Sequence, residues 1–128
     1  MARILLVDDD ENILHAIGAF LEKNGHSVQL CSDPTTAVGL AEKMAADLAI
    51  IDYEMPRLTG TQLLALLRAG KITSSLPVLF LSGTQPLNYI FEVRPDSRVR
   101  FLSKPVNFDE FKGAIAALLN PEGGSAKT

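Results

Sequence analysis

Side chains that could carry chemistry follow several aliphatic runs of this sequence. They are acidic, hydroxylic or cationic, and they comprise Asp8, Asp9, Asp10, Asp52, Ser82 and Lys104. Carboxylates that lie close together raise one another's pKa unless a cation offsets their repulsion. Their hard oxygen atoms suit Mg²⁺ or Mn²⁺, and Mg²⁺ takes one or two carboxylates together with phosphate oxygens. The residue types therefore predict an acidic site for a divalent cation and a phosphoryl group.

The chemistry expected of such a site is phosphoryl transfer to a carboxylate. A carboxylate beside a divalent cation can attack phosphorus and form an acyl phosphate. The transfer depends more on positioning and on neutralisation of charge than on further covalent help. Lys104 would supply a fixed positive charge for one phosphoryl oxygen, and Ser82 a hydroxyl donor for another. Together these residues predict a site that accepts a phosphoryl group.

The elements that must position these side chains alternate between strand and helix patterns. Short, mostly apolar runs predict strands at Arg3–Val7, Ser27–Cys31, Leu48–Ile51, Pro77–Leu81 and Val99–Leu102. Segments with a helical period of apolar residues lie between them. This alternation predicts an α/β fold, (βα)5, with a doubly wound parallel five-stranded sheet and helices on both faces. In such sheets ligands bind at the carboxyl ends of the strands, where the polar residues lie.

Residues that favour helix ends separate the strands. Asp10 is expected to cap the first helix rather than to bind a ligand. Asp33, followed by proline, predicts a second helix that runs to about Ala46. Asn107 predicts the cap of the last helix, with a glutamate three residues further on. Between the fourth and fifth strands a short helix is expected at roughly Leu87 to Val93.

Four motifs, in their order along the chain, resemble the receiver domains of two-component response regulators. They are the acidic pair of LLVDD, the D-x-x-M-P-x-x-x-G run from Asp52 to Gly60, Ser82-Gly83, and Lys104-Pro105. The resemblance implies a flavodoxin-like fold with strand order 2-1-3-4-5 and a requirement for Mg²⁺ or Mn²⁺. It also implies phosphoryl transfer from a sensor histidine kinase or a histidine phosphotransfer protein. Phosphorylation would then switch a protein-interaction surface for an unknown downstream effector protein or domain.

The resemblance implies a role for each residue of the acidic site. Asp52 matches the phospho-acceptor, which also contributes to the metal site. Asp9 matches the direct metal ligand, with Asp8 acting through water. Glu54 stands at the position whose backbone carbonyl binds the metal. Lys104 matches the lysine that contacts the phosphoryl group, and its peptide bond to the following proline is expected to be cis.

Two further residues match the switch of the family. Ser82 matches the hydroxyl that turns toward the phosphoryl group, and Phe101 matches the aromatic residue that then turns inward. An ordinary core role for Phe101 remains an alternative, since only its position suggests a switch. The segment between these two residues departs from the family pattern, because it carries Pro86 and Pro95 and lacks the usual Gly-Ala turn. This departure leaves open how partners bind through the neighbouring helix and strand.

Two other functions compete with the receiver interpretation. A haloacid-dehalogenase-type phosphatase would use Asp8 and Asp10 as a D-x-D pair. Such enzymes expect Thr or Val shortly afterwards, where Asn12 and Ile13 stand here, and a second acidic pair beyond the lysine. A non-phosphorylated pseudo-receiver would act only as an interaction module, but its acidic pocket is usually degraded, whereas this one is complete. The chain is therefore expected to be a signalling switch and not a multiple-turnover enzyme.

Composition and charge argue against several other classes. The net charge is −3 and the basic residues are scattered, so no direct binding to nucleic acid or to a membrane is expected. No apolar run reaches the roughly 18 residues that span a bilayer, and the start lacks a signal-peptide layout, which favours a cytoplasmic protein. Cys31 is expected to be a small, partly buried residue at a strand end. Residues 1–120 are expected to form the receiver domain, and residues 121–128 a flexible tail or linker stub.

Overall fold

The computed structural model describes residues 2–83 and 98–120. Its centre is one parallel sheet of five strands: β1 (Arg3–Val7), β2 (Ser27–Cys31), β3 (Leu48–Asp52), β4 (Val78–Ser82) and β5 (Val99–Ser103). The strand order is β2-β1-β3-β4-β5, which confirms the predicted fold class and order. Each strand lies within one residue of its predicted bounds. The short helix expected at Leu87 to Val93 and the tail at 121–128 lie outside the described residues.

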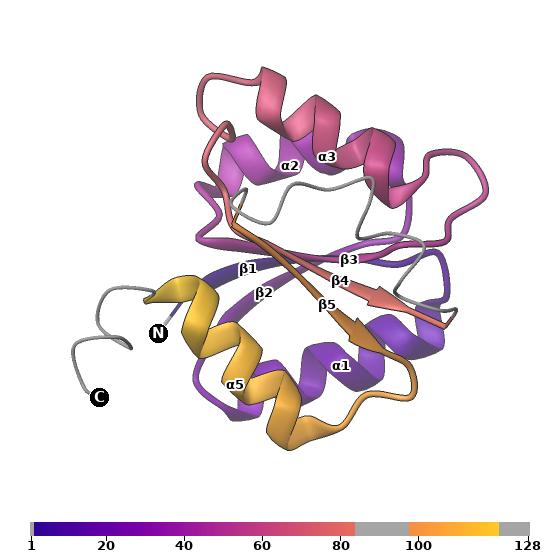
Figure 1. The fold of residues 1–128 in the computed structure, drawn as a ribbon, viewed down its shortest axis with the longest axis vertical. Coiled ribbons are helices and arrows are strands. Elements are labelled where there is room, and N and C mark those ends of the chain that lie inside the picture. Colours follow the sequence, from indigo (N-terminus) through magenta and orange to yellow (C-terminus); the bar gives the residue numbers. More distant parts are fainter. Residues whose placement is uncertain (1, 84–97, 121–128) are drawn as a thin grey trace.

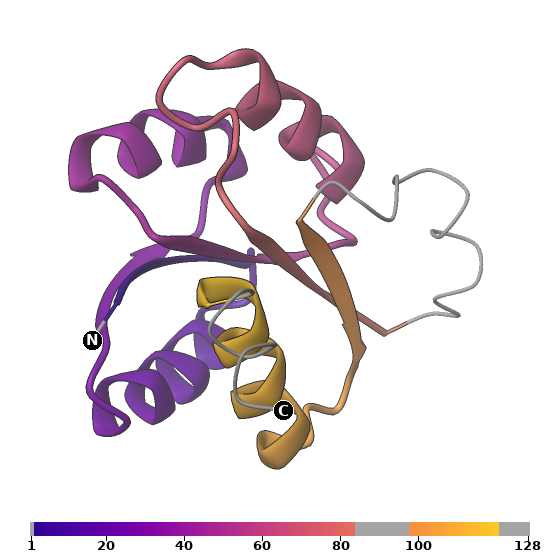
Figure 2. The ribbon, with the colours of Figure 1, turned by 60° about the vertical axis from the view of Figure 1, so that its left-hand side comes forward.

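Helices cover both faces of the sheet (Figure 1, Figure 2). One face carries α1 (Glu11–Lys23) and α5 (Phe108–Leu119), and the other carries α2 (Ala37–Met44) and α3 (Gly60–Ala69). Side chains alternate between the two faces of a strand, so each central strand contributes to two cores. On β1, Ile4 and Leu6 belong to the core beneath α1 and α5, whereas Leu5 and Val7 belong to the core beneath α2 and α3. The carboxyl ends of the strands are therefore held rigidly at one edge.

Side-chain caps start the first and last helices where the sequence predicts them. Asp10 accepts hydrogen bonds from the backbone N–H groups of Asn12 and Ile13, at 2.9 and 3.4 Å. Asn107 accepts one from the backbone N–H of Glu110, at 3.1 Å. Both caps satisfy N–H groups that have no partner within the helix. Asp10 is thus confirmed as the cap of α1.

The second helix differs from the predicted one at both ends. Asp33 caps a 3-10 turn, Pro34–Thr36, and α2 begins only after it. The backbone N–H and the hydroxyl of Thr36 both donate to the carbonyl of Asp33, at 3.0 and 2.9 Å, which holds the first turn in the tighter geometry. The helix ends at Met44, because Ala45 takes a left-handed conformation with φ 52°.

A glycine fixes the approach of α3 to the sheet. Thr59 and Gln62 form a capping box that starts this helix. A Cβ atom on Gly60 would lie 2.8 Å from Cε1 of Phe80 and 2.9 Å from Cδ1 of Tyr53. Only glycine fits this close approach without displacing a ring. The loop that follows Asp52 is thereby anchored against the core at its far end.

Two expectations from composition can be compared with the described part of the chain. Cys31 lies at the end of β2, as predicted, but it is buried rather than partly buried, and its thiol donates to the carbonyl of Asp33 at 3.1 Å. Across residues 2–83 and 98–120, no helix has the length and apolar character that crossing a membrane requires.

Candidate functional site

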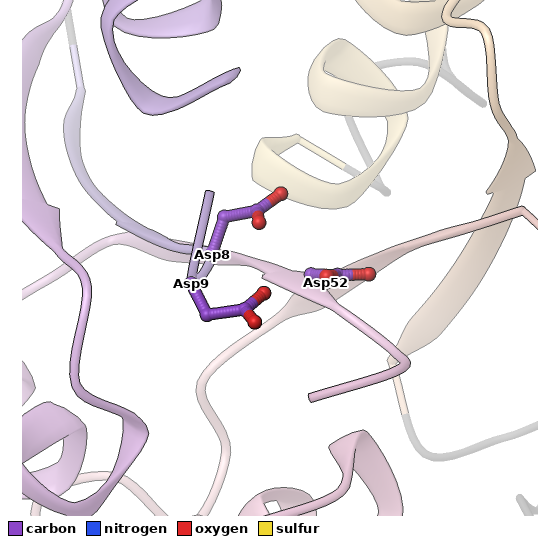
Figure 3. Close-up of side chains that lie close together, drawn as sticks. All are labelled: Asp8, Asp9 and Asp52. Carbon is purple, nitrogen blue, oxygen red and sulfur yellow. The ribbon is translucent and has the colours of Figure 1, made fainter. Parts of the chain in front are cut away.

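Three carboxylates meet at the carboxyl edge of the sheet (Figure 3). Asp8 and Asp9 follow β1, and Asp52 ends β3, which pairs directly with β1 through Val7 and Ile51. One oxygen atom from each carboxylate lies within 4.8 Å of the other two. Asp8 and Asp52 are buried, whereas Asp9 is exposed. The structure therefore brings together the three acids that the sequence analysis selected for the metal site.

Lys104 reaches this acid cluster from the loop after β5. Its Nζ lies 3.1 Å from Oδ1 of Asp52 and 3.6 Å from Oδ2 of Asp8. Its backbone N–H donates to the carbonyl of Ser82 at 2.8 Å, which ties the loop to the end of β4. The peptide bond between Lys104 and Pro105 is cis, as the resemblance implies. One ammonium group thus faces the two buried acids.

The electrostatics of the cluster disfavour the charged carboxylates. Burial raises the pKa of Asp8 from 3.8 to about 6. The nearby charges of Asp52 and Asp9 add to the rise. The hydrogen bond from the backbone N–H of Asp10 and the charge of Lys104 oppose it. Burial also raises the pKa of Asp52, against the hydrogen bond and charge of Lys104. Burial lowers the pKa of Lys104, but its contacts with Asp52 and Asp8 outweigh burial, so that its pKa is raised overall. One charged lysine therefore stands against three carboxyl groups.

The donor set of the cluster fits a hard divalent cation. Carboxylate oxygens from two strand ends lie close enough to contact one ion, and Mg²⁺ prefers oxygen ligands and keeps several waters. The backbone N–H of Glu54 donates to Oδ1 of Asp52 at 3.3 Å, so the loop that carries the Glu54 carbonyl turns beside Asp52. A cation would also offset the negative charge that Lys104 leaves unbalanced.

Ser82 ends β4 and is 1% exposed. Its hydroxyl donates to Oε2 of Glu54 at 2.8 Å, and the backbone N–H of Gly83 donates to Oε1 of the same carboxylate at 3.2 Å. The sequence analysis assigned the Glu54 backbone carbonyl to the metal site and did not predict these side-chain contacts. The signal that could have found them is positional, because Glu54 and Ser82 follow neighbouring strands at the same edge of the sheet.

Phe101 lies away from the acid cluster, in the middle of β5. Its ring centroid lies 5.1 Å from that of Phe80 and 5.6 Å from that of Tyr53. The Tyr53 ring meets Phe80 edge-on at 5.1 Å, and its hydroxyl is hydrogen-bonded to that of Thr61. Phe101 therefore packs against the core beneath α2 and α3, and Tyr53, the residue after Asp52, links it to the site.

The parallel sheet, the acids at its carboxyl edge and the lysine that faces them together define a class of protein. The chain belongs to the family of response regulator receiver domains, whose model matches residues 4–116. This family membership confirms the resemblance found in the sequence motifs.

Particular relatives differ in length from this chain. PilH of Pseudomonas aeruginosa is 33% identical over 120 residues, which cover 93% of this chain and 98% of PilH. RpaA of Synechocystis, a DNA-binding dual master transcriptional regulator, is 29% identical over 93% of this chain and 49% of RpaA. MprA of Mycolicibacterium vanbaalenii, a response regulator, is 30% identical over 98% of this chain and 55% of MprA. The chain thus spans nearly all of PilH and about half of the other two.

Solved structures of similar proteins share the fold. A response regulator receiver domain protein from Clostridium thermocellum has a TM-score of 0.85 and 29% identity, covering 96% of this chain and 98% of that one. The chemotaxis protein CheY4 of Vibrio cholerae has a TM-score of 0.86 and 26% identity, covering 93% of this chain and 99% of that one.

Proposed function

We propose that this receiver domain accepts a phosphoryl group on Asp52 with the help of Mg²⁺ or Mn²⁺. The observation that carries the proposal is the contact of 3.1 Å between the buried Asp52 carboxylate and Lys104, inside a cluster of three acids. A nucleophilic carboxylate, a fixed cation and ligands for a metal are the parts that an acyl phosphate site needs. We take residues 1–120 as the extent of the domain.

The reaction would transfer a phosphoryl group from a histidine to Asp52. One carboxylate oxygen of Asp52 attacks phosphorus, while the bond from phosphorus to the imidazole nitrogen of the donor breaks and its electron pair returns to that nitrogen. The product is an acyl phosphate on Asp52 and a free histidine on the donor. Lys104, already beside Asp52, would neutralise one oxygen of the transferred group, and the hydroxyl of Ser82 would donate to another.

The chain's own oxygen atoms would hold the cation. Asp9, Asp52 and the backbone carbonyl of Glu54 would bind it directly, and Asp8 would bind it through water. When bound, Mg²⁺ supplies positive charge that offsets the repulsion between the acids and the incoming phosphoryl group. The raised pKa values of Asp8 and Asp52 support this role, because buried acids with excess negative charge gain most from a cation.

Ser82 and Phe101 would transmit the phosphorylation to the surface. The phosphoryl group offers the Ser82 hydroxyl a new acceptor, which would draw the end of β4 toward Asp52. Phe101 lies on the adjacent strand, opposite Phe80 of β4, and its ring packs on those of Phe80 and Tyr53. Movement at the end of β4 would therefore bias Phe101 between two packings.

A sensor histidine kinase or a histidine phosphotransfer protein would be the donor, and we propose that the protein acts in the cytoplasm. An apolar groove of about 280 Å³ begins beside Lys104 and supports this assignment. Its walls come from α1, from the loop after β5 and from the start of α5, and they comprise Ile13, Ala16, Ile17, Lys104, Pro105, Val106 and Phe108. A donor must bring its phosphohistidine to Asp52, so its surface would cover this groove. The downstream effector protein or domain is unknown.

The phosphatase alternative is disfavoured by the use of Asp10. That alternative needs the carboxylates of Asp8 and Asp10 as a pair, but the Asp10 carboxylate caps α1 through Asn12 and Ile13. The pseudo-receiver alternative is disfavoured because the acid cluster and Lys104 are complete. We therefore propose a signalling switch that acts in its own phosphorylation and not a multiple-turnover enzyme.

The test is phosphorylation by acetyl phosphate in the presence of Mg²⁺. The wild-type chain should gain one phosphoryl group that hydroxylamine removes, as measured by intact-protein mass spectrometry. Asp52→Asn should gain none, and EDTA should abolish the reaction of the wild type. Glu22→Gln, which removes an exposed carboxylate on α1, should react like the wild type. Incorporation by Asp52→Asn at the wild-type rate would show that another residue is the acceptor.

A further inference from the structure

The carboxylate of Glu54 bridges the ends of two neighbouring strands. Glu54 follows β3, whereas Ser82 and Gly83 follow β4, and the two strands pair up to Asp52 and Leu81. Oε2 accepts the Ser82 hydroxyl at 2.8 Å, and Oε1 accepts the Gly83 N–H at 3.2 Å. Both oxygens of the carboxylate are thus engaged by the donors at the end of β4.

One of these donors, the Ser82 hydroxyl, is the one that the proposed phosphoryl group on Asp52 would need. A serine hydroxyl has one proton to donate, so it serves either the Glu54 carboxylate or a phosphoryl oxygen. Both acceptors are anionic oxygens, and hydrogen bonds to either are charge-assisted. Ser82 is 1% exposed, so its hydroxyl is shielded from bulk water. The hydroxyl therefore exchanges one anionic acceptor for another.

We propose that the Glu54 side chain is a positioning residue that holds Ser82 and Gly83 in the resting arrangement, in competition with the phosphoryl group. This role is separate from that of the Glu54 backbone carbonyl in the metal site. It rests on the proposed function of Asp52 and deepens it, because it assigns a residue that sets how readily phosphorylation moves Ser82. Removal of the competing carboxylate makes the phosphorylated arrangement easier to reach.

The size of the effect follows from the value of one charge-assisted hydrogen bond. Such a bond is worth about tenfold in an equilibrium constant. Glu54→Gln keeps the length of the side chain but removes the charge and one of the two acceptor oxygens. Glu54→Asp keeps the charge but is one methylene shorter, so it loses the reach to Ser82. The two variants separate the hydrogen bonds from simple repulsion between Glu54 and an incoming phosphoryl group.

The first measurement needs neither metal nor phosphate. Amide NMR spectra of the wild type and of Glu54→Gln in EDTA should differ at Gly83, whose N–H signal should move upfield when its anionic acceptor is lost. Its hydrogen exchange should also become faster. An unchanged Gly83 signal would overturn the proposal, whatever the outcome of the phosphorylation test.

The second measurement is the affinity of beryllofluoride, a phosphoryl mimic, at saturating Mg²⁺. Glu54→Gln and Glu54→Asp should each bind it about tenfold more tightly than the wild type. In a Ser82→Ala background the same two substitutions should change the affinity by less than about twofold, because the competition for the hydroxyl is gone. An equal gain with and without Ser82, or wild-type affinity of Glu54→Asp, would assign the effect to charge repulsion and overturn the proposal. Failure of every variant to bind the mimic would instead contradict the proposed function, and the Gly83 result would still decide the role of Glu54.

Discussion

Replacement of Asp8 by asparagine should stabilise the metal-free protein at neutral pH, although Asp8 belongs to the candidate site. Burial raises the pKa of Asp8 from 3.8 to about 6 in the folded chain, whereas the unfolded chain keeps the ordinary value. Such a rise in the pKa corresponds to about 3 kcal/mol in the free energy of unfolding. The folded state binds the Asp8 proton more tightly than the unfolded state does. The protonated carboxyl group therefore contributes its full share to the free energy of unfolding below about pH 4, and this share is lost as the pH rises through 6. Asparagine resembles the protonated carboxyl group and retains the contribution at every pH.

The assay is urea unfolding of the wild type and Asp8→Asn in EDTA, at pH 4 and at pH 7.5. The free energies of unfolding should agree within about 1 kcal/mol at pH 4, and the variant should be about 3 kcal/mol more stable at pH 7.5. That difference corresponds to about 10 °C in the midpoint of thermal unfolding. Comparison of the two proteins at each pH cancels the titration of carboxylates that do not interact with Asp8.

A control separates burial of Asp8 from the general effect of one negative charge. Glu22→Gln removes an exposed carboxylate from α1 and should change the stability by less than about 0.5 kcal/mol at either pH. Saturating Mg²⁺ should narrow the gap between the wild type and Asp8→Asn, because the ion binds the folded wild type. Equal stability of the two proteins at pH 7.5 would refute the reasoning, since burial would then leave the Asp8 carboxylate at no disadvantage.

Two further pairs of variants test other parts of the structure. Asp9→Ala should weaken Mg²⁺ binding in calorimetric titrations far more than Asp10→Ala, which should instead lower the free energy of unfolding by about 1 kcal/mol through loss of the α1 cap. Equal losses of Mg²⁺ affinity would favour the D-x-D interpretation. Gly60→Ala should cost about 1–3 kcal/mol in urea unfolding, because the added Cβ meets the rings of Phe80 and Tyr53. Gly113→Ala, in α5 with open space around it, should instead raise the free energy of unfolding by about 0.5–1 kcal/mol. Equal effects of the two alanines would contradict the close approach of Gly60 to the two rings.

The strands could be predicted because parallel strands leave a strong trace in sequence, whereas their order was implied by the resemblance to receiver domains. A strand buried on both faces is apolar throughout, and β3 and β4 are buried at every position. The polar residue that ends each run then marks the edge where ligands bind, which is how Asp52 and Ser82 were selected. The strand bounds differ by one residue where this polar residue itself joins the sheet, as it does in β3, β4 and β5.

Features that depend on individual side-chain contacts were not predicted. The start of α2 depends on whether the hydroxyl of Thr36 bonds to the carbonyl of Asp33, and the same residues also occur in regular helix starts. The contact of Glu54 with Ser82 joins residues 28 positions apart and depends on one side-chain conformation. The packing of Tyr53 on Phe101 likewise follows from the pairing of strands and not from any local pattern.

The acid cluster and the Glu54 contact together determine how much a phosphoryl group can change this domain. The resting site holds buried carboxylates that Lys104 alone does not balance, so a divalent cation would be attracted to it and would offset the repulsion of an incoming phosphoryl group. A ligand shifts an equilibrium between two arrangements only by the difference in its affinity for them. If Ser82 had no acceptor at rest, it would gain a whole hydrogen bond on phosphorylation. Because Glu54 already accepts it, Ser82 gains only the difference between two anionic acceptors. The resting population is therefore sensitive to Glu54, and a substitution there can shift it without any change to Asp52.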